Sequence, residues 1–257
     1  MIGVFDSGIG GLAVFSELRR LLPEADLVYV ADHSHAPYGV RSLEDLRRRC
    51  EDVADWLISS GCRVVTLACN TASAAALHPL RRRRPATAFV GMEPALKPAV
   101  ETTGTGKVGV VATAATFQGE LFASVVDRFA IGVEVVTAAC PRWVELVEED
   151  AVSGREARRE VEGCLAPMVD AGIDVLVLAC THYPALTGLI AEVLGPDVQI
   201  IDPAPAVARQ TARVAAESLA ANGAGTTQLF TTGDLARLQR AVDRAGIDGP
   251  VSLLPLV

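Results

Sequence analysis

Two of the six cysteines stand in matching local sequences, which makes them the first candidates for chemistry. Cys69 lies in the run Val-Val-Thr-Leu-Ala-Cys-Asn-Thr, and Cys180, 111 residues later, lies in Val-Leu-Val-Leu-Ala-Cys-Thr-His. Two thiols on opposite sides of a bound molecule could exchange a proton at a stereocentre, because one thiolate removes the proton and the opposite thiol delivers another. His182 follows Cys180 by two residues and could polarise that thiol or relay its proton.

A cysteine acts as a base near neutral pH only where the protein stabilises its thiolate, since the reference pKa is about 8.5. Helix N-termini, hydrogen bonds and neighbouring cations provide that stabilisation. Cys69 and Cys180 are each followed by polar residues and a helical run, which predicts positions near such N-termini. Taken singly, either cysteine could instead be a small buried core residue, and His182 could be structural.

Polar residues near the cysteines are candidates for holding a substrate. The glycine-rich turn from Asp6 to Gly11 lacks the Lys-Ser/Thr ending of a phosphate-binding P-loop, but its backbone N–H groups could hold a carboxylate. Asp6 is too acidic to be a good first base for a carbon acid, so we expect it to assist Cys69. Hydrogen-bonding groups suited to an ammonium and a carboxylate come from Pro37, Tyr38, Gly39, Asn70 and Thr71. Asp32, His33 and His35 are equally compatible with a solvated loop.

Lysine is scarce, which bears on cofactor use. The chain holds only Lys97, in a proline-rich segment, and Lys107, before a predicted strand. A pyridoxal-phosphate enzyme needs a lysine for the Schiff base, and neither position favours one, so we expect no cofactor. The cysteines form no C-x-x-C pair and are widely spread, so we expect no metal site and reduced thiols.

The elements that position these candidates can be predicted from the sequence, in which short β-branched runs alternate with longer amphipathic segments. That alternation predicts an α/β fold with mostly parallel sheets, in which ligands bind at the carboxyl ends of the strands. The predicted strands are Ile2–Phe5, Leu27–Ala31, Val64–Ala68, Val108–Ala112, Val133–Thr137, Val175–Ala179 and Val198–Ile201.

The repeated cysteine run has a counterpart at the first strand, because the segments that begin at Ile2 and Val108 also align. The two offsets, 111 and 106 residues, predict two similar domains related by a pseudo-twofold axis, with the active site in the cleft between them. Proline-rich joints place the crossings near residues 94 and 204. We therefore expect a first domain of residues 1–94 plus 205–257 and a second of residues 95–204.

Composition excludes several classes of protein. A net charge of −8 and a pI near 5.1 argue against nucleic-acid binding, and the basic run Arg81–Arg84 is best explained as a solvated helix end. No apolar run reaches the roughly 18 residues that cross a bilayer, and no signal peptide is evident. We expect a cytoplasmic protein with no membrane partner. The apolar helix faces permit a homodimer, although no interface can be named.

Taken together, these motifs resemble those of the glutamate racemases, within the aspartate/glutamate racemase superfamily, over essentially the full chain. The matching motifs are Asp6-Ser7-Gly8-x-Gly10-Gly11, Pro37-Tyr38-Gly39, Ala68-Cys69-Asn70-Thr71-Ala72, Ala112-Thr113-x-x-Thr116, Cys140-Pro141 with Val147-Glu148-Glu149, Cys180-Thr181-His182-Tyr183-Pro184 and Thr232-Gly233-Asp234.

The resemblance implies two flavodoxin-like domains and cofactor-independent interconversion of L- and D-glutamate, which supplies D-glutamate for peptidoglycan. It implies that Cys69 and Cys180 are the bases, with Asp6 beside the first and His182 with Glu148 beside the second. Binding of the substrate's charged groups would fall to residues that include Ser7, Tyr38, Gly39, Asn70, Thr71, Thr113, Thr116 and Thr181.

The chain departs from the family pattern in one loop. Relatives commonly read Gly-Asp-Thr-x-x-x-Pro-Tyr-Gly, whereas this chain has Ala31, Asp32 and His33 at the first three positions. That difference could alter substrate preference. The chain also begins at its first predicted strand, so we expect it to lack the N-terminal extension that some relatives use for activation by a cell-wall precursor.

Three alternatives remain open on the sequence. Paired cysteines do not select the side chain, so the substrate could be aspartate, a hydantoin or a related carbon acid. A binding protein that keeps the two domains would show affinity without isotope exchange. A metal-dependent hydrolase could use Cys69, Cys180 and His182 as ligands, and would then contain zinc.

Overall fold

The computed structural model describes residues 1–218, 223–254 and 256. The chain divides into two compact units, one formed by Met1–Met92 with Ala204–Val257 and the other by Glu93–Pro203. The domain boundaries expected from the sequence, after residues 94 and 204, lie two residues and one residue from these divisions. Among the described residues, no helix is long and apolar enough to cross a membrane.

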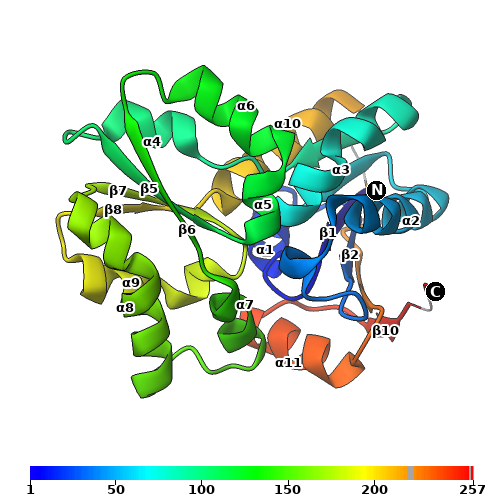
Figure 1. The fold of residues 1–257 in the computed structure, drawn as a ribbon. Helices are drawn as coiled ribbons and strands as arrows, with labels where there is room; N and C mark the ends of the chain where they lie inside the picture. The colour runs from blue at the N-terminus through cyan, green and yellow to red at the C-terminus, as the bar shows by residue number, and fades with distance from the viewer. Residues whose placement is uncertain (219–222, 255, 257) are drawn as a thin grey trace. The chain divides into compact units, whose positions relative to one another are not determined.

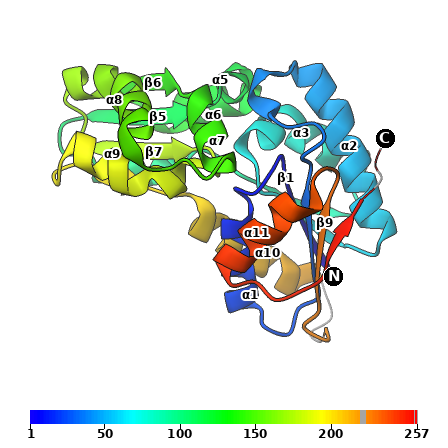
Figure 2. The ribbon, with the colours of Figure 1, turned by 90° about the horizontal axis from the view of Figure 1, so that it is seen from below.

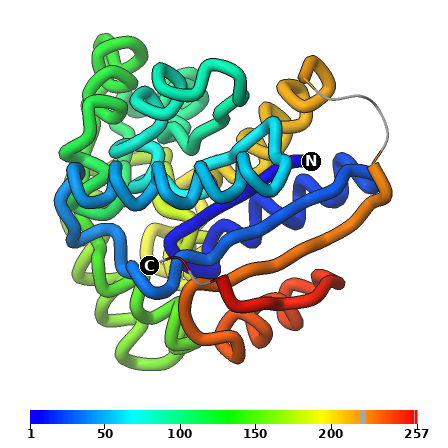
Figure 3. Tube along the Cα trace, turned by 90° about the vertical axis from the view of Figure 1, so that its right-hand side faces the viewer, coloured from blue at the N-terminus to red at the C-terminus, as the bar shows by residue number. Residues whose placement is uncertain are grey.

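The first unit is built on a six-stranded sheet in the order β10-β9-β2-β1-β3-β4, in which every described pair is parallel. Its strands are β1 (Ile2–Asp6), β2 (Leu27–Ala31), β3 (Val64–Leu67), β4 (Ala88–Gly91), β9 (Thr227–Thr231) and β10 (Val251–Leu253). Figure 3 shows β9, in orange, running beside the blue strand β2, although almost two hundred residues separate them along the chain.

Helices cover both faces of this sheet. Figure 2 shows α2 and α3 on one side of the strands and α1, α10 and α11 on the other. Side chains of the second group pack with Ile2, Val4 and Leu27 in one continuous core. The helices are α1 (Leu12–Leu21), α2 (Leu43–Ser59), α3 (Asn70–Arg83), α10 (Ala204–Ser218) and α11 (Leu235–Ala245), with a 3-10 turn η1 (Tyr38–Val40).

Helix α2 illustrates how local sequence sets these elements. Ser42 caps its first turn by accepting a hydrogen bond from the Asp45 N–H, and acidic Glu44 and Asp45 suit the positive end of the helix. Leu46, Val53 and Leu57 recur at helical spacing and are fully buried.

The second unit repeats the plan on a four-stranded parallel sheet in the order β6-β5-β7-β8. In Figure 1, α4 and α6 lie on one face of this sheet and α8 and α9 on the other. Its strands are β5 (Lys107–Ala112), β6 (Glu134–Ala139), β7 (Val175–Ala179) and β8 (Gln199–Ile201). Its helices are α4 (Leu96–Thr102), α5 (Ala114–Gln118), α6 (Glu120–Phe129), α7 (Pro141–Glu148), α8 (Gly154–Ala171), the 3-10 turn η2 (Tyr183–Leu186) and α9 (Thr187–Leu194).

The α/β class with mostly parallel sheets is confirmed, and the two sheets share one strand order. The order β2-β1-β3-β4 in the first unit corresponds to β6-β5-β7-β8 in the second. In each, the chain order reverses between the first and third strands, where parallel sheets bind ligands at the carboxyl ends. Cys69 follows β3 and Cys180 follows β7, so the thiols occupy equivalent positions.

One sequence expectation is wrong, because the structure contains a disulfide. Cys140, at the start of α7, is bonded to Cys164 in α8, with α-carbons 5.9 Å apart. The two residues are 24 positions apart and meet only because α7 packs on α8, a contact that their spacing does not reveal. The other four cysteines, Cys50, Cys62, Cys69 and Cys180, are outside disulfides.

Candidate active site

Cys69 sits at the turn from β3 into α3, where it caps the helix. The Ala72 N–H donates a hydrogen bond to Sγ over 3.5 Å, and Sγ lies 3.9 Å from the Ser7 hydroxyl oxygen. The residue is 5% exposed. An N–H group at the positive end of a helix stabilises negative charge, so this position favours the thiolate form, as the sequence led us to expect.

Asp6 ends β1 and shapes the turn that carries Ser7. Its fully buried carboxylate accepts hydrogen bonds from the N–H groups of Gly8 at 3.3 Å and Gly11 at 2.9 Å. A Cβ on Gly11 would come within 2.7 Å of the Asp6 Cβ, so only glycine lets the turn close this tightly. The turn that Asp6 holds in shape places the hydroxyl of the next residue, Ser7, beside the Cys69 sulfur. Its predicted assistance to the thiol stays a prediction.

Asn70 and Thr71 form the first turn of α3 directly after the thiol, and both are almost fully buried. Within the described part of the chain, neither the amide nitrogen nor the amide oxygen of Asn70 has a hydrogen-bond partner. Leaving buried polar atoms unpaired costs about 1–3 kcal/mol. An amide of this kind beside a thiol is suited to pair with both a donor and an acceptor of a polar ligand.

The loop after β2 carries Pro37, Tyr38 and Gly39, the last two within η1. Tyr38 is 1% exposed, and its hydroxyl donates to Asp32 Oδ2 at 2.6 Å. Burial, together with the nearby Cys50 and Asp32, raises the pKa of Tyr38 well above its usual value. The hydroxyl is therefore a structural donor, which leaves the backbone of Tyr38 and Gly39 as the part of the motif that could bind a ligand.

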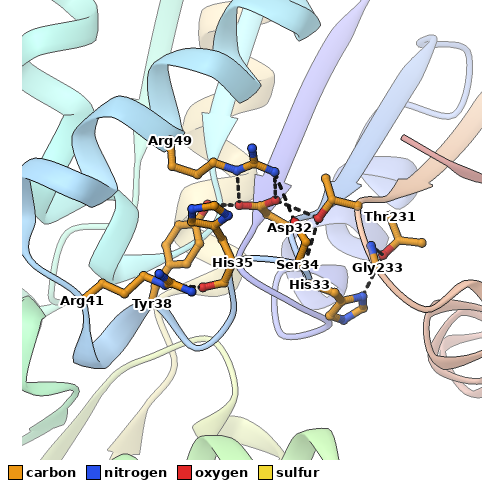
Figure 4. Close-up of polar contacts among 10 residues, drawn as sticks. Asp32, His33, Ser34, His35, Tyr38, Arg41, Arg49, Thr231 and Gly233 are labelled. Carbon is orange, nitrogen blue, oxygen red and sulfur yellow. Dashed lines mark hydrogen bonds and ion pairs between the residues drawn. The ribbon is translucent and has the colours of Figure 1, made fainter. Parts of the chain in front are cut away.

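Asp32 is a correction to the solvated-loop interpretation, because the structure buries it completely against Arg49 of α2 (Figure 4). Burial alone would raise the pKa of Asp32, but hydrogen bonds from Arg49 and Tyr38 lower it below its ordinary value. Sequence reasoning missed Arg49. The signal was its helical spacing, since it lies three residues after Leu46 and four before Val53, on the apolar face of α2.

The second thiol has a different environment. Cys180 follows β7 and is 7% exposed, and its Sγ lies 3.9 Å from Nδ1 of His182. The opposite ring nitrogen, Nε2, lies 2.6 Å from Oε1 of Glu148, the last residue of α7. Burial opposes a charge on His182, but the hydrogen bonds to Cys180 and Glu148 outweigh it and raise the pKa of the imidazole well above 6.5.

The His182 imidazole, whose pKa is raised, therefore stands beside Cys180 in place of the expected helix N-terminus. After the thiol the chain turns into η2 at Tyr183, and α9 begins only at Thr187. The Tyr183 hydroxyl donates to the carbonyl oxygens of Ala112 and Cys140, at 3.0 and 2.9 Å. The Tyr183 ring packs edge-on against Trp143 of α7. Tyr183, which the sequence analysis gave only as part of a motif, fixes the loop that carries His182 to the helix that carries Glu148.

Three threonines complete the predicted set. Thr113 follows β5 and caps α5, and its hydroxyl lies 3.0 Å from that of Thr116. Both are buried, as is Thr181 beside the second thiol. Thr113 follows β5 as Ser7 follows β1, so each unit places a hydroxyl after its first strand and a thiol after its third. Among the residues described, no group of three or more His, Cys, Asp or Glu side chains could hold a metal ion.

Comparisons with known proteins place this arrangement in a family context. A family model described as Asp/Glu/Hydantoin racemase matches residues 2–211. A glutamate racemase of Pseudomonas aeruginosa (strain UCBPP-PA14) is 47% identical over 235 residues, which span 91% of this chain and 89% of that protein.

Solved structures agree with the sequence comparison. The crystal structure of a glutamate racemase isoform from Bacillus anthracis superposes with a TM-score of 0.89 at 32% identity, covering 99% of this chain and 97% of that one. The glutamate racemase of Francisella tularensis, solved in complex with D-glutamate, superposes with a TM-score of 0.87 at 28% identity, covering 100% of this chain and 97% of that one.

Proposed function

Because this chain belongs to the Asp/Glu/hydantoin racemase family, we propose that it interconverts L- and D-glutamate by direct proton transfer with Cys69 and Cys180. The observation that carries the proposal is the equivalence of the two thiols. Each follows the third strand, in chain order, of its unit, and each sulfur has a polar partner, the Ala72 N–H at Cys69 and the His182 ring at Cys180. A core cysteine needs no such partner.

The proton transfers balance without an outside donor. One thiolate takes the proton from the α-carbon while the other, as a thiol, donates its proton to the opposite face, and the reverse reaction restores the first state. Both thiols must therefore reach the α-carbon of the same glutamate molecule. Ala72 N–H supports the Cys69 thiolate, and protonated His182, held by Glu148, supports the Cys180 thiolate.

The charged groups of glutamate need partners that the buried hydroxyls and amides supply. We assign Asn70 to the substrate because its buried amide has no partner among the described residues, whereas a bound amino acid offers both donors and acceptors. Donors fixed before binding also stabilise the negative charge that develops at the carboxylate as the α-proton leaves. The other proposed binding residues are Ser7, Pro37, Tyr38, Gly39, Thr71, Thr113, Thr116, Thr181 and His182.

The proposal is tested with single enantiomers of glutamate in D₂O, without pyridoxal phosphate. The wild type should racemise both enantiomers and incorporate deuterium at the α-carbon. In Cys180→Ser, inversion should be lost in both directions, because the two enantiomers have equal free energy in water. The enantiomer that presents its α-proton to Cys69 should still exchange deuterium without inversion, and Cys69→Ser should show this for the opposite enantiomer.

Two results would contradict the proposal. Absence of exchange with glutamate, but exchange with aspartate or a hydantoin, would move the substrate within the family. Retention of inversion in either serine variant would exclude the two-thiol route. Cys62→Ser is the matched control, because Cys62 is a buried thiol at the opposite end of β3 and should leave racemisation unchanged.

We further propose that the protein acts in the cytoplasm, supplies D-glutamate for peptidoglycan and forms a homodimer. The role in peptidoglycan is what the resemblance to the glutamate racemases implies. A bacterium without its own glutamate racemase should grow without added D-glutamate when it expresses the wild type but not Cys69→Ser. Sedimentation equilibrium tests the dimer, and a mass of 26.9 kDa at all concentrations would refute it.

A further inference from the structure

The loop after β2 is fixed at its root by one buried carboxylate. Asp32 Oδ2 accepts from Arg49 Nε at 2.8 Å, and Oδ1 accepts from Arg49 Nη2 at 2.6 Å. Figure 4 shows the two side chains facing each other as a paired fork. The arginine side chain is 3% exposed and the aspartate fully buried, so water does not weaken the pair.

The same carboxylate accepts two more hydrogen bonds, from two different segments. Tyr38 donates to Oδ2 at 2.6 Å, and Thr232, after β9, donates to Oδ1 at 2.8 Å. Thr232 Oγ1 also accepts from the Ser34 N–H at 3.0 Å. Asp32 therefore ties together the end of β2, helix α2, the Tyr38 turn and the segment after β9.

The motif Thr232-Gly233-Asp234, which the catalytic proposal does not use, closes this arrangement. A Cβ on Gly233 would lie 2.8 Å from the His33 Cβ, so glycine allows the two loops to pack directly together. The carboxylate of Asp234 caps α11 by accepting from Ala236 N–H and Arg237 N–H. His33 stands where relatives commonly have threonine, and its Nδ1 lies 2.9 Å from the hydroxyl oxygen of Thr231. His33 therefore also joins the loop after β2 to the end of β9 (Figure 4).

We propose that Asp32, Arg49 and Thr232 are positioning residues, which hold the backbone of Tyr38 and Gly39 in place for the substrate. This inference rests on the proposed function, since it assigns a task to residues behind the predicted binding loop. The Asp32 carboxylate accepts hydrogen bonds from Arg49, Tyr38 and Thr232. The Tyr38 hydroxyl donates its proton to Asp32 and so is not available to donate to a substrate. A substrate then meets a loop whose geometry is set before it arrives, which lowers the entropy cost of binding.

Thr232→Val and Thr232→Ser form the sharpest test. Valine keeps the shape of the side chain and removes its hydroxyl, whereas serine keeps the hydroxyl. We expect Thr232→Val to raise KM for glutamate about tenfold with kcat within about twofold, the pattern for a lost contact that serves ground and transition states alike. Thr232→Ser should restore the wild-type KM. A KM that is unchanged in Thr232→Val overturns the proposal.

The buried pair is tested by removing both charges together, because a lone buried charge destabilises the fold. In Asp32→Asn/Arg49→Gln we expect a cooperative fold, a raised KM, and faster amide hydrogen exchange in residues 33–41. The matched control is Glu51→Gln/Arg83→Gln, which removes an ion pair between α2 and α3 whose arginine is 57% exposed, and should alter neither readout.

Hydrogen exchange separates failure of this inference from failure of the proposed function. If the wild type does not racemise glutamate, the proposed function is wrong. Faster amide hydrogen exchange in residues 33–41 of Thr232→Val would still support the role of Thr232 in holding this loop. Unchanged exchange in both the Thr232→Val and the paired variant would overturn it. If Asp32→Asn/Arg49→Gln does not fold, Tyr38→Phe takes its place, because it removes only the hydrogen bond from the Tyr38 hydroxyl to Asp32. Amide hydrogen exchange in residues 33–41 that is no faster in Tyr38→Phe than in the wild type would overturn the proposal.

Discussion

Glu148→Gln tests how the second thiol is activated. Glutamine keeps the size of the side chain and can still accept a hydrogen bond from His182 Nε2, which now lies 2.6 Å from the carboxylate. Only the charge is lost. A hydrogen bond to a charged group contributes about 1.5–3 kcal/mol and a neutral one about 0.5–1.5 kcal/mol, so the imidazolium loses on the order of 1–1.5 kcal/mol of stabilisation.

That loss corresponds to about one pKa unit and to about a tenfold change in rate. Because the carboxylate raises the pKa of His182, its removal lowers that pKa, and the imidazolium is lost at lower pH. We therefore expect kcat/KM at neutral pH to fall about tenfold in both directions. The high-pH limb of the profile should move about one unit toward lower pH.

Racemisation followed by circular dichroism across the pH range measures both effects, and thermal unfolding checks that the fold survives. Glu149→Gln is the matched control, since its carboxylate is the next along the chain and its side chain is 58% exposed. It should leave the profile unchanged. Wild-type kcat/KM with an unshifted high-pH limb in Glu148→Gln would refute the argued role of the Glu148–His182 pair.

Three other predictions follow from single features. Asn70→Leu should maintain or raise Tm, because it removes unpaired buried polar atoms, yet weaken glutamate binding at least about tenfold; a lower Tm with unchanged KM contradicts this. Asp174 accepts hydrogen bonds from the Thr105 N–H and hydroxyl, among others, which outweigh burial and lower its pKa to about 2. The Asp174 carboxylate contributes to stability above its unfolded pKa of about 3.9, and this contribution is lost as the pH falls through about 2. The free energy of unfolding, measured against pH in acid, should therefore become equal for the wild type and Asp174→Asn near pH 2. Cys164→Ser opens the 24-residue loop to Cys140 and should lower the free energy of unfolding by about 3 kcal/mol; a denaturant midpoint that neither this variant nor dithiothreitol shifts would argue against the disulfide.

The sequence alone predicted the alternation of elements, because the period of apolar residues is a local property. Strands β2 and β7 begin and end at the predicted residues, and the repeat of the cysteine runs corresponds to two sheets with one strand order. Strands β4, β9 and β10 were missed. β4 and β10 are short edge strands, and β9 pairs with β2 from almost two hundred residues away, so no local pattern marks its partner.

The candidate thiols were also identified from sequence, since a repeated motif after a predicted strand is visible without coordinates. Their partners were only partly accessible. His182 is close to Cys180 along the chain, and Glu148 came from family resemblance, but the 2.6 Å contact between them depends on how α7 packs beside η2.

Tertiary structure alone decided the state of the polar side chains. Helical spacing places Arg49 on the apolar face of α2, but only helix packing pairs it with Asp32. Nothing local distinguishes Cys140 and Cys164 from the other cysteines until helix packing brings the two thiols together. Charge pairing and disulfide formation depend on distance in space and on exclusion of water. The sequence therefore determined which residues could do chemistry and on which elements they stand, and the fold decided which of them are buried, paired and held in place.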